Sequence, residues 1–332
     1  MAALPPWHTA CRADVVLVPD TIAGILDGDG SLYLAARRGK RHVPAVSLTL
    51  RDDDPTTIAV ARSLAAYLGR SIGLVGCWGG RHVWRVASVA DVAALLRFLA
   101  RHPLLSPRGA RQQAALAEAV AILQASRTRG GRAPLREGER EHLAALAARI
   151  GRRRAENPLP LPEVARAAGD RQLGDYFTGL VATEGCLEAR SSRTHHVRPA
   201  FRLTQRIDNF ALLELLRERL GIGDIVRVSV RVGSPAFQLV VQRGEDVDAL
   251  VRLLRAHPLP ASSPKAGQFD AWVELIALRR GILTLGTRGD LARSSTLAAV
   301  AGEIRAAKRY AGHQELCTCR ARGAAADAGS GT

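Results

Sequence analysis

The chain has 332 residues, 47% of them hydrophobic and 23% charged, with a formal net charge of +16 at pH 7. This composition is that of a globular protein rather than a disordered one, and the length allows two domains. The basic excess favours a polyanionic partner, with nucleic acid ahead of an anionic membrane surface, although arginine and alanine enrichment also fits GC-rich coding.

Nothing in the sequence indicates a membrane or secreted protein. No apolar run approaches the roughly 20 residues that span a bilayer, and the N-terminal stretch lacks the basic region and apolar core of a signal peptide. The five cysteines are odd in number and scattered, which is typical of free thiols in a reducing compartment. We therefore expect a cytoplasmic protein without membrane contact.

In chain order, the first elements alternate between helical and strand periodicity. A helix begins at the start signal Pro19-Asp20-Thr21 and ends among the aspartates and glycines of DGDGS. The elements predicted after it are strands within 31–50, a helix that ends at Gly69, strands within 74–86 and a helix over 89–102.

The second half repeats this order at a spacing of 155 positions, with a slight slip near the ends of the halves, where Arg108 matches Lys265. Asp29 matches Glu184, Gly24 matches Gly179, and the tripeptide HPL occurs at the matched positions 102 and 257. Matches in one order across most of each half indicate a tandem duplication. Each copy reads as an α+β unit with an antiparallel sheet.

Composition sets the expected boundaries of the two copies. We assign residues 15–156 to the N-terminal half and residues 170–312 to the C-terminal half. The Pro-rich stretch at 157–169 is the linker between them, because proline makes a connection stiff and extended. Residues 313–332 are a polar tail that we expect to be flexible.

The stretch TIAGILDGDGSL, from Thr21, ends an apolar helix in two carboxylates set among glycines. A calcium loop of the EF-hand type needs a glycine at its sixth position and a glutamate at its twelfth, where this chain has Leu32 and Arg38. A buried helix with a polar end is the plain alternative. The second copy argues against this alternative, because the residue that matches Asp29 is also an acid, Glu184.

Small residues predict that the two motif helices pack on each other. They recur at a four-residue spacing, as Gly24 and Gly28 in the first helix and Gly179 and Thr183 in the second, and this spacing allows helix backbones to approach closely. Two carboxylates brought together at the helix ends are costly unless a divalent cation neutralises them. We therefore predict a Mg²⁺ or Mn²⁺ site at Asp29 and Glu184, with Gly28 and Thr183 also in it.

The segments IAGILDGDG and FTGLVATEG resemble the two LAGLIDADG motifs of single-chain homing endonucleases. The first is a close match and the second a weaker one, and the order of strands and helices extends the resemblance over most of the chain. It implies a monomer of two αββαββα halves related by a pseudo-twofold, each offering a curved antiparallel sheet to the DNA major groove. It also implies metal-dependent cleavage of both strands of a double-stranded site, with Asp29 and Glu184 as the metal-binding acids.

The same resemblance implies further catalytic residues. Gln205 matches a strand-end position that is commonly glutamine and that orders water near the metal. Arg108 and Lys265 match basic residues that approach the scissile phosphate. The counterpart of Gln205 in the first half is Leu50, which departs from the family pattern. This departure is consistent with an enzyme that cuts one strand more slowly, or with one that only nicks DNA.

Alternation along the strands predicts the residues that contact DNA. Arginine on a groove-facing side can pair with guanine and serine with several bases, whereas basic residues at a hairpin tip contact phosphate. The predicted contacts are Tyr33, Arg37, Arg38, Lys40, Arg41 and Ser47 in the first half and Glu188, Arg190, Ser192, Arg202, Arg227, Ser229 and Arg231 in the second. Because the two sets differ, the target should be asymmetric.

Two other functions fit the same fold. One is a DNA-binding regulator that does not cleave, which would usually have lost one of the motif acids, and here both are present. The other is an RNA maturase that assists splicing, which binding to intron RNA would separate from a nuclease.

Overall fold

The computed structural model describes residues 16–37, 41–50, 54–78, 81–128, 135–151, 157–191, 197–228, 235–284, 297, 299–302 and 304. The predicted tail and five of the predicted DNA contacts lie outside these residues, namely Arg38, Lys40, Ser192, Ser229 and Arg231. Within the described part of the chain, no helix is long and apolar enough to cross a membrane.

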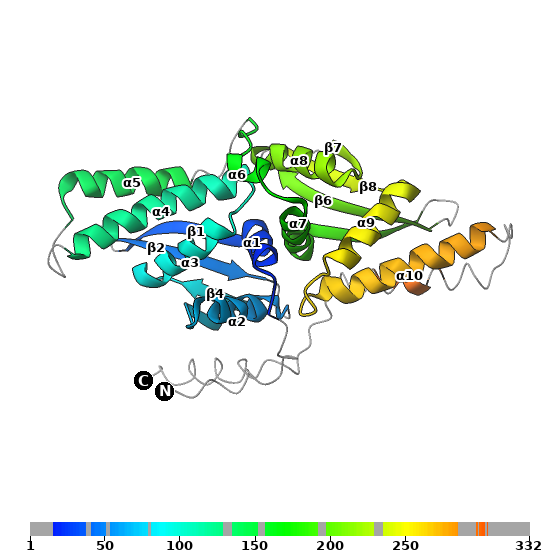
Figure 1. The fold of residues 1–332 in the computed structure, drawn as a ribbon, viewed down its shortest axis with the longest axis horizontal. Coiled ribbons are helices and arrows are strands. Elements are labelled where there is room, and N and C mark those ends of the chain that lie inside the picture. The colour runs from blue at the N-terminus through cyan, green and yellow to red at the C-terminus, as the bar shows by residue number, and fades with distance from the viewer. Residues whose placement is uncertain are drawn as a thin grey trace, which may run out of the picture.

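The chain folds into two α+β units that lie side by side (Figure 1). The first contains α1 (Pro19–Gly28), β1 (Gly30–Arg37), β2 (Arg41–Thr49), α2 (Thr56–Leu68), β3 (Leu74–Trp78), β4 (Arg81–Val86), α3 (Val89–Arg101), α4 (Pro107–Thr128) and α5 (Glu137–Gly151). The short α6 (Glu163–Arg166) lies between the units. The second contains α7 (Asp170–Glu184), β5 (Gly185–Ser191), β6 (Val197–Arg206), the 3-10 turn η2 (Ile207–Asn209), α8 (Phe210–Leu220), β7 (Asp224–Val228), β8 (Ala236–Val241), α9 (Gly244–Ala256) and α10 (Pro264–Thr284). The predicted fold class, with the αββαββα order occurring twice, is confirmed.

Each unit has a four-stranded antiparallel sheet, and the strand orders β1-β2-β4-β3 and β5-β6-β8-β7 are equivalent. The register aligns Leu32 with Val46 and Val46 with Val86, and all three side chains are buried in the core. Successive side chains of a strand point to opposite faces. The face that α3 and α4 cover is therefore apolar, and the other face is left to the polar residues.

The helix ends follow local sequence signals. α2 and α8 end at Gly69 and Gly221, whose φ angles of 66° and 64° lie in the left-handed region that glycine adopts without a steric cost. α3 begins after Ser88, whose Oγ accepts a hydrogen bond from the Asp91 backbone N–H at 3.0 Å. The glycine stop predicted for α2 is confirmed.

The two motif helices, α1 and α7, lie against each other at the centre of the molecule (Figure 1). At Gly24 a Cβ atom would come within 3.0 Å of the Tyr176 carbonyl oxygen, and at Gly179 within 3.0 Å of the Thr21 carbonyl oxygen. A Cβ at Gly28 would likewise meet the Thr183 hydroxyl. The four small residues predicted at the helix contact thus all lie in it, and the backbones touch where side chains are missing.

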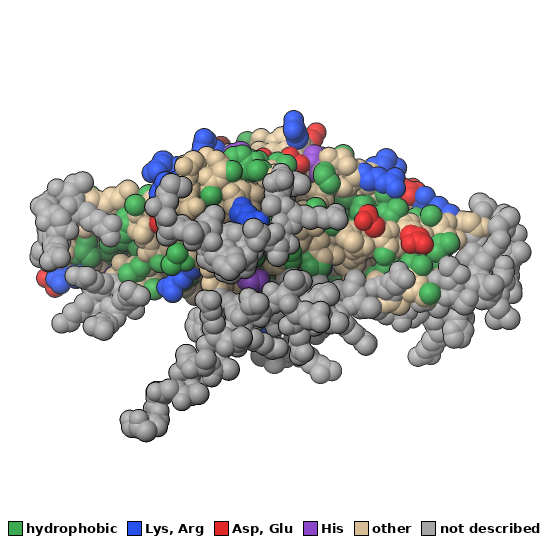
Figure 2. All heavy atoms as spheres, turned by 90° about the horizontal axis from the view of Figure 1, so that it is seen from below, with side chains coloured by type: hydrophobic (Ala, Val, Ile, Leu, Met, Phe, Trp, Pro, Cys, Tyr) green, Lys and Arg blue, Asp and Glu red, His purple; other side chains and the backbone are tan. Residues whose placement is uncertain are grey.

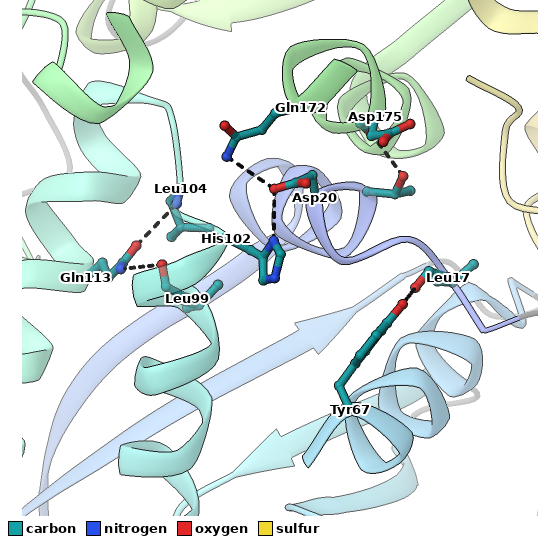
Figure 3. A network of polar contacts seen from close by, with 10 residues as sticks. Leu17, Asp20, Tyr67, Leu99, His102, Leu104, Gln113, Gln172 and Asp175 are labelled. Atoms are coloured by element: carbon teal, nitrogen blue, oxygen red, sulfur yellow. Dashed lines mark hydrogen bonds and ion pairs between the residues drawn. The ribbon is translucent and has the colours of Figure 1, made fainter. Parts of the chain in front are cut away.

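Equivalent polar contacts are made by Asp20 of α1 and by Asp175 of α7. The Nδ1 atom of His102, which follows α3, lies 3.1 Å from Asp20 Oδ1, and Nδ1 of His257, which follows α9, lies 2.7 Å from Asp175 Oδ1. Gln172 donates a further hydrogen bond to Asp20 at 3.2 Å (Figure 3). The repeated HPL tripeptide therefore marks a structural contact between each motif helix and the helix that precedes the tripeptide.

Candidate active site

The acids predicted to bind metal lie at the same end of the α1–α7 pair. Asp29 follows the last residue of α1, and its backbone N–H still donates to the Ile25 carbonyl at 3.1 Å. Glu184 is the last residue of α7. Its Cγ atom would lie 3.5 Å from a Cβ placed at Gly28. The close approach of the helices therefore brings one carboxylate from each half to a shared position.

The electrostatics of Glu184 reflect this arrangement. Desolvation by the protein around the carboxylate, and then the negative charge of Asp29, raise its pKa to about 7, while Lys265 acts in the opposite direction. The residue still exposes surface to solvent, so the carboxylate is partly desolvated but remains accessible to a ligand. A divalent cation would relieve the repulsion between the two acids, so the donor set fits such an ion.

A cleft of about 200 Å³ lies beside Glu184 and is lined from both halves. Arg108 enters it from the start of α4, and Gln205 enters it from the end of β6. Lys265, at the start of α10, donates a hydrogen bond to the carbonyl of Gly185, the residue after Glu184. The predicted residues Arg108, Gln205 and Lys265 therefore all lie near Glu184, although they come from distant parts of the chain.

The first half has no amide at the position that matches Gln205. Leu50 occupies it and is 6% exposed, as part of the hydrophobic core. Gln205 is 8% exposed and polar. The second half therefore supplies an amide where the first half has an apolar side chain, as the sequence predicts.

Asp27, the other motif acid of the first half, is a structural residue. Its carboxylate accepts hydrogen bonds from the Ser106 backbone N–H at 2.9 Å, from Ser106 Oγ at 2.5 Å and from the Tyr176 hydroxyl. Burial raises the pKa of Asp27, while the hydrogen bonds from Ser106 and Tyr176 lower it. The group ties the end of α1 to the start of α4, beside Arg108. In the second half the matching residue is the buried Ala182.

Tyr176→Phe should destabilise the protein by about 2 kcal/mol, because a hydrogen bond to a buried carboxylate contributes about 1.5–3 kcal/mol. Urea denaturation of the variant gives the loss directly. Tyr67→Phe is the matched control, since the Tyr67 hydroxyl donates to the neutral Leu17 carbonyl at 2.9 Å at a partly buried site. A loss at Tyr176 no larger than the loss at Tyr67 would contradict this role for Asp27.

Comparison with known proteins bears on the fold. No protein-family model and no curated protein matches the sequence. Among solved structures, I-SmaMI, a LAGLIDADG homing endonuclease bound to cleaved DNA, superimposes with a TM-score of 0.70 at 17% identity, covering 87% of this chain and 97% of that one. This chain has the LAGLIDADG homing endonuclease fold.

Two further structures agree. The LAGLIDADG homing endonuclease I-GzeII, in complex with its DNA target, gives a TM-score of 0.66 at 14% identity, with 86% of this chain and 97% of that chain covered. I-SmaMI bound to uncleaved DNA in the presence of calcium ions gives a TM-score of 0.68 at 18% identity, covering 87% of this chain and 99% of that one. The predicted resemblance to the single-chain, two-motif form is confirmed at the level of the fold.

In this LAGLIDADG fold, the uncovered face of each sheet carries most of the predicted DNA contacts. Ser47 aligns with Ser31 and Arg85, and Tyr33 lies on the same face. In the second sheet this face carries Glu188, Arg190 and Arg202, and the Glu188 carboxylate lies 3.4 Å from Arg202 Nε and 3.8 Å from Arg190 Nε. Arg37 and Arg41 align with each other at the end of the β1–β2 hairpin.

The register corrects the expected face of Arg227. It aligns with Phe237, which aligns with Gln205, so it lies on the opposite side of the sheet from Arg202 and Thr204. Sequence reasoning also missed polar residues on the uncovered faces. These are Arg81 and Arg85 on β4, Arg198 on β6, and Gln238 on β8, whose Nε2 donates to Thr204 Oγ1 at 3.0 Å.

On the face drawn in Figure 2, the charged side chains of the described residues do not form one basic patch. In the view of Figure 2, the Lys and Arg side chains that are coloured lie at separate places, with Asp and Glu side chains also present on the same face. The alternation of side chains on the two sheets is therefore the better guide to where a ligand lies.

Proposed function

We propose that the protein is a metal-dependent DNA endonuclease that cleaves a long, asymmetric double-stranded site, acting as a monomer with Mg²⁺ or Mn²⁺. The observation that carries this proposal is the meeting of Asp29 and Glu184 at the paired helix ends, beside the cleft that holds Arg108 and Gln205. The fold, which it shares with DNA-bound homing endonucleases, supports the proposal.

Asp29 and Glu184 are the residues that would hold the cation, with the Gly28 and Thr183 positions beside them. Within the described residues no cluster of three or more His, Cys, Asp or Glu side chains occurs, so other oxygen ligands would complete the site. A bound Mg²⁺ or Mn²⁺ supplies an activated water and stabilises the leaving oxygen of a phosphodiester.

The remaining groups act on DNA and water. Arg108 in the cleft and Lys265 near Glu184 supply positive charge, which can offset the charge that develops on a phosphate during hydrolysis. The Gln205 amide can hold a water molecule by hydrogen bonds. On the uncovered sheet faces, arginine and serine side chains provide base readout, and the different composition of the two sheets favours an asymmetric target.

The proposal is tested by selecting bound duplexes from a randomised DNA library and then adding Mg²⁺ or Mn²⁺. Sequencing of the new ends on both strands should reveal cuts in one long asymmetric sequence. Specific binding without cutting in either metal would overturn the endonuclease proposal and favour a DNA-binding regulator. Selective binding of structured RNA in preference to duplex DNA would favour a maturase.

The affinity for Mn²⁺ should fall as the pH falls below about 7, by up to about tenfold per pH unit, because Glu184 must lose its proton to bind metal. Because the pKa of Glu184 is raised from 4.5 to about 7, protonation of Glu184 stabilises the metal-free protein. This contribution is fully present below pH 4.5 and is lost as the pH rises through about 7. Calorimetric titration with Mn²⁺ between pH 5.5 and 8 measures the effect. The same slope in Glu184→Gln would show that another group titrates.

A further inference from the structure

Asn209 connects two catalytic candidates that belong to different halves of the molecule. It is the last residue of η2, directly after β6, and is 8% exposed. Its Oδ1 accepts a hydrogen bond from the Arg108 backbone N–H at 3.2 Å, and its Nδ2 donates to Gln205 Oε1 at 2.9 Å. All three residues line the cleft beside Glu184.

The direction of these hydrogen bonds is fixed by chemistry. Arg108 is the second residue of α4, where a backbone N–H has no partner within the helix and can only donate. Asn209 must therefore present its oxygen to Arg108 and its amino group to Gln205. Gln205 must then use its oxygen as the acceptor, which leaves its own Nε2 amino group to donate to a ligand in the cleft.

The η2 turn carries a buried carboxylate next to Asn209. The Asp208 carboxylate is 1% exposed and lies 3.4 Å from Arg206 Nη2. Asp208 also attracts the Arg108 guanidinium, and this attraction raises the pKa of Arg108 against the larger lowering by burial. Asp208 thus places a buried negative charge on the side of the turn from which Arg108 approaches.

The matching positions in the first half carry different side chains. The position that matches Asn209 is Asp54, whose Oδ1 accepts a hydrogen bond at 2.9 Å from the backbone N–H of Thr56, the first residue of α2. The position that matches Gln205 is the apolar Leu50. The hydrogen-bond relay from Arg108 through Asn209 to Gln205 therefore belongs to one side of the site.

We propose that Asn209 is a positioning residue that fixes Gln205 as a hydrogen-bond donor in the cleft and thereby favours cleavage of the DNA strand bound on that side. The cleavage part of this inference rests on the proposed endonuclease function. The donor suits an acceptor such as a phosphate oxygen or the oxygen of the attacking water, whereas a carboxylate or a reversed amide would present an acceptor there.

Asn209→Asp tests the relay, because an aspartate still accepts from Arg108 but offers only an oxygen to Gln205, which forces that amide to turn. The variant should cut one strand about 10- to 100-fold more slowly, which is the usual effect of losing a group that orients a catalytic residue. The cleavage rate of the other strand and the DNA affinity should stay within about twofold of the wild-type values. Gln205→Glu should slow the same strand. The double variant should be no slower than the slower single variant, because both changes remove the same donor.

The matched control is Asp54→Asn, the isosteric exchange at the pseudo-equivalent position, which keeps an oxygen for the Thr56 N–H. This variant should keep the wild-type ratio between the cleavage rates of the two strands. Equal slowing of both strands by Asn209→Asp, or additive losses in the double variant, would overturn a strand-specific positioning role and indicate general destabilisation.

A measurement that does not depend on cleavage separates this inference from the proposed function. With selective isotope labelling, NMR scalar coupling across hydrogen bonds should connect the Asn209 side-chain nitrogen with the Gln205 side-chain carbonyl carbon, and the coupling should vanish in Asn209→Asp. Absence of the coupling in the wild-type protein would overturn the relay even in an active nuclease. Presence of the coupling in a protein that cuts no DNA would refute the endonuclease and leave the relay intact.

Discussion

Asp29→Asn and Glu184→Gln should each slow DNA cleavage by about 10³-fold or more and leave DNA affinity within a few fold. Each exchange keeps the shape of the side chain and removes a negative charge from the shared position at the ends of α1 and α7. A cation that stabilises the developing charge contributes several kcal/mol to the transition state, and each 1.36 kcal/mol corresponds to about tenfold in rate. Single-turnover cleavage of the selected site, at saturating protein, isolates this effect from binding.

The control for the charge change is Asp170→Asn on the same helix. Its side chain is 88% exposed and pairs with Arg219 at 2.5 Å at the opposite end of α7 from Glu184. This exchange should leave the cleavage rate within about twofold, because a surface ion pair contributes little. Cleavage at half the wild-type rate or more by either motif variant would show that the carboxylates do not carry the reaction.

Gly179→Ala should lower the free energy of unfolding by about 3 kcal/mol, at the upper end of the usual cost of overpacking. The new Cβ would come within 3.0 Å of the Thr21 carbonyl oxygen and within 3.0 Å of Ile25 N and Gly24 Cα. All of these neighbours are backbone atoms, so α1 and α7 must move apart for the side chain to fit. Because the same contact brings Asp29 to Glu184, cleavage should fall with stability.

Gly267→Ala in α10 is the matched control for this exchange. A Cβ there meets nothing within 4 Å, so alanine should stabilise the helix by about 1 kcal/mol or less through its higher helix propensity. Denaturation curves for the two variants should therefore move in opposite directions. A Gly179→Ala protein as stable as the wild type would mean that the helices do not pack through their glycines.

The fold could be predicted from the sequence because its determinants repeat. The acid at Asp29 recurs at Glu184, and Gly24 recurs at Gly179, so two weak signals became one strong one. Strand faces followed from the period of two, and this worked for Tyr33, Ser47 and Arg202, whose faces agree with the observed register.

Apart from the packing of the two motif helices, contacts between the halves could not be predicted, because no sequence period links the residues that make them. Arg108 and Asn209 are 101 residues apart, and Tyr176 is 149 residues from Asp27. Alternation within a strand also does not say which face is covered. Arg227 was placed by counting along its own strand, whereas its face is decided by alignment with Phe237 and, through it, with Gln205.

The central claim is that the carboxylates of Asp29 and Glu184 hold the metal that cuts DNA. The most direct measurement is to titrate Mn²⁺ into the metal-free complex of the protein with its selected duplex, following bound Mn²⁺ by electron paramagnetic resonance and strand scission in the same samples. We predict that uptake and scission rise together over one range of Mn²⁺ concentration in the wild-type protein, and that both are lost in the Asp29→Asn, Glu184→Gln double variant. Undiminished scission in the double variant, or bound Mn²⁺ in the wild-type complex without scission, would contradict the account.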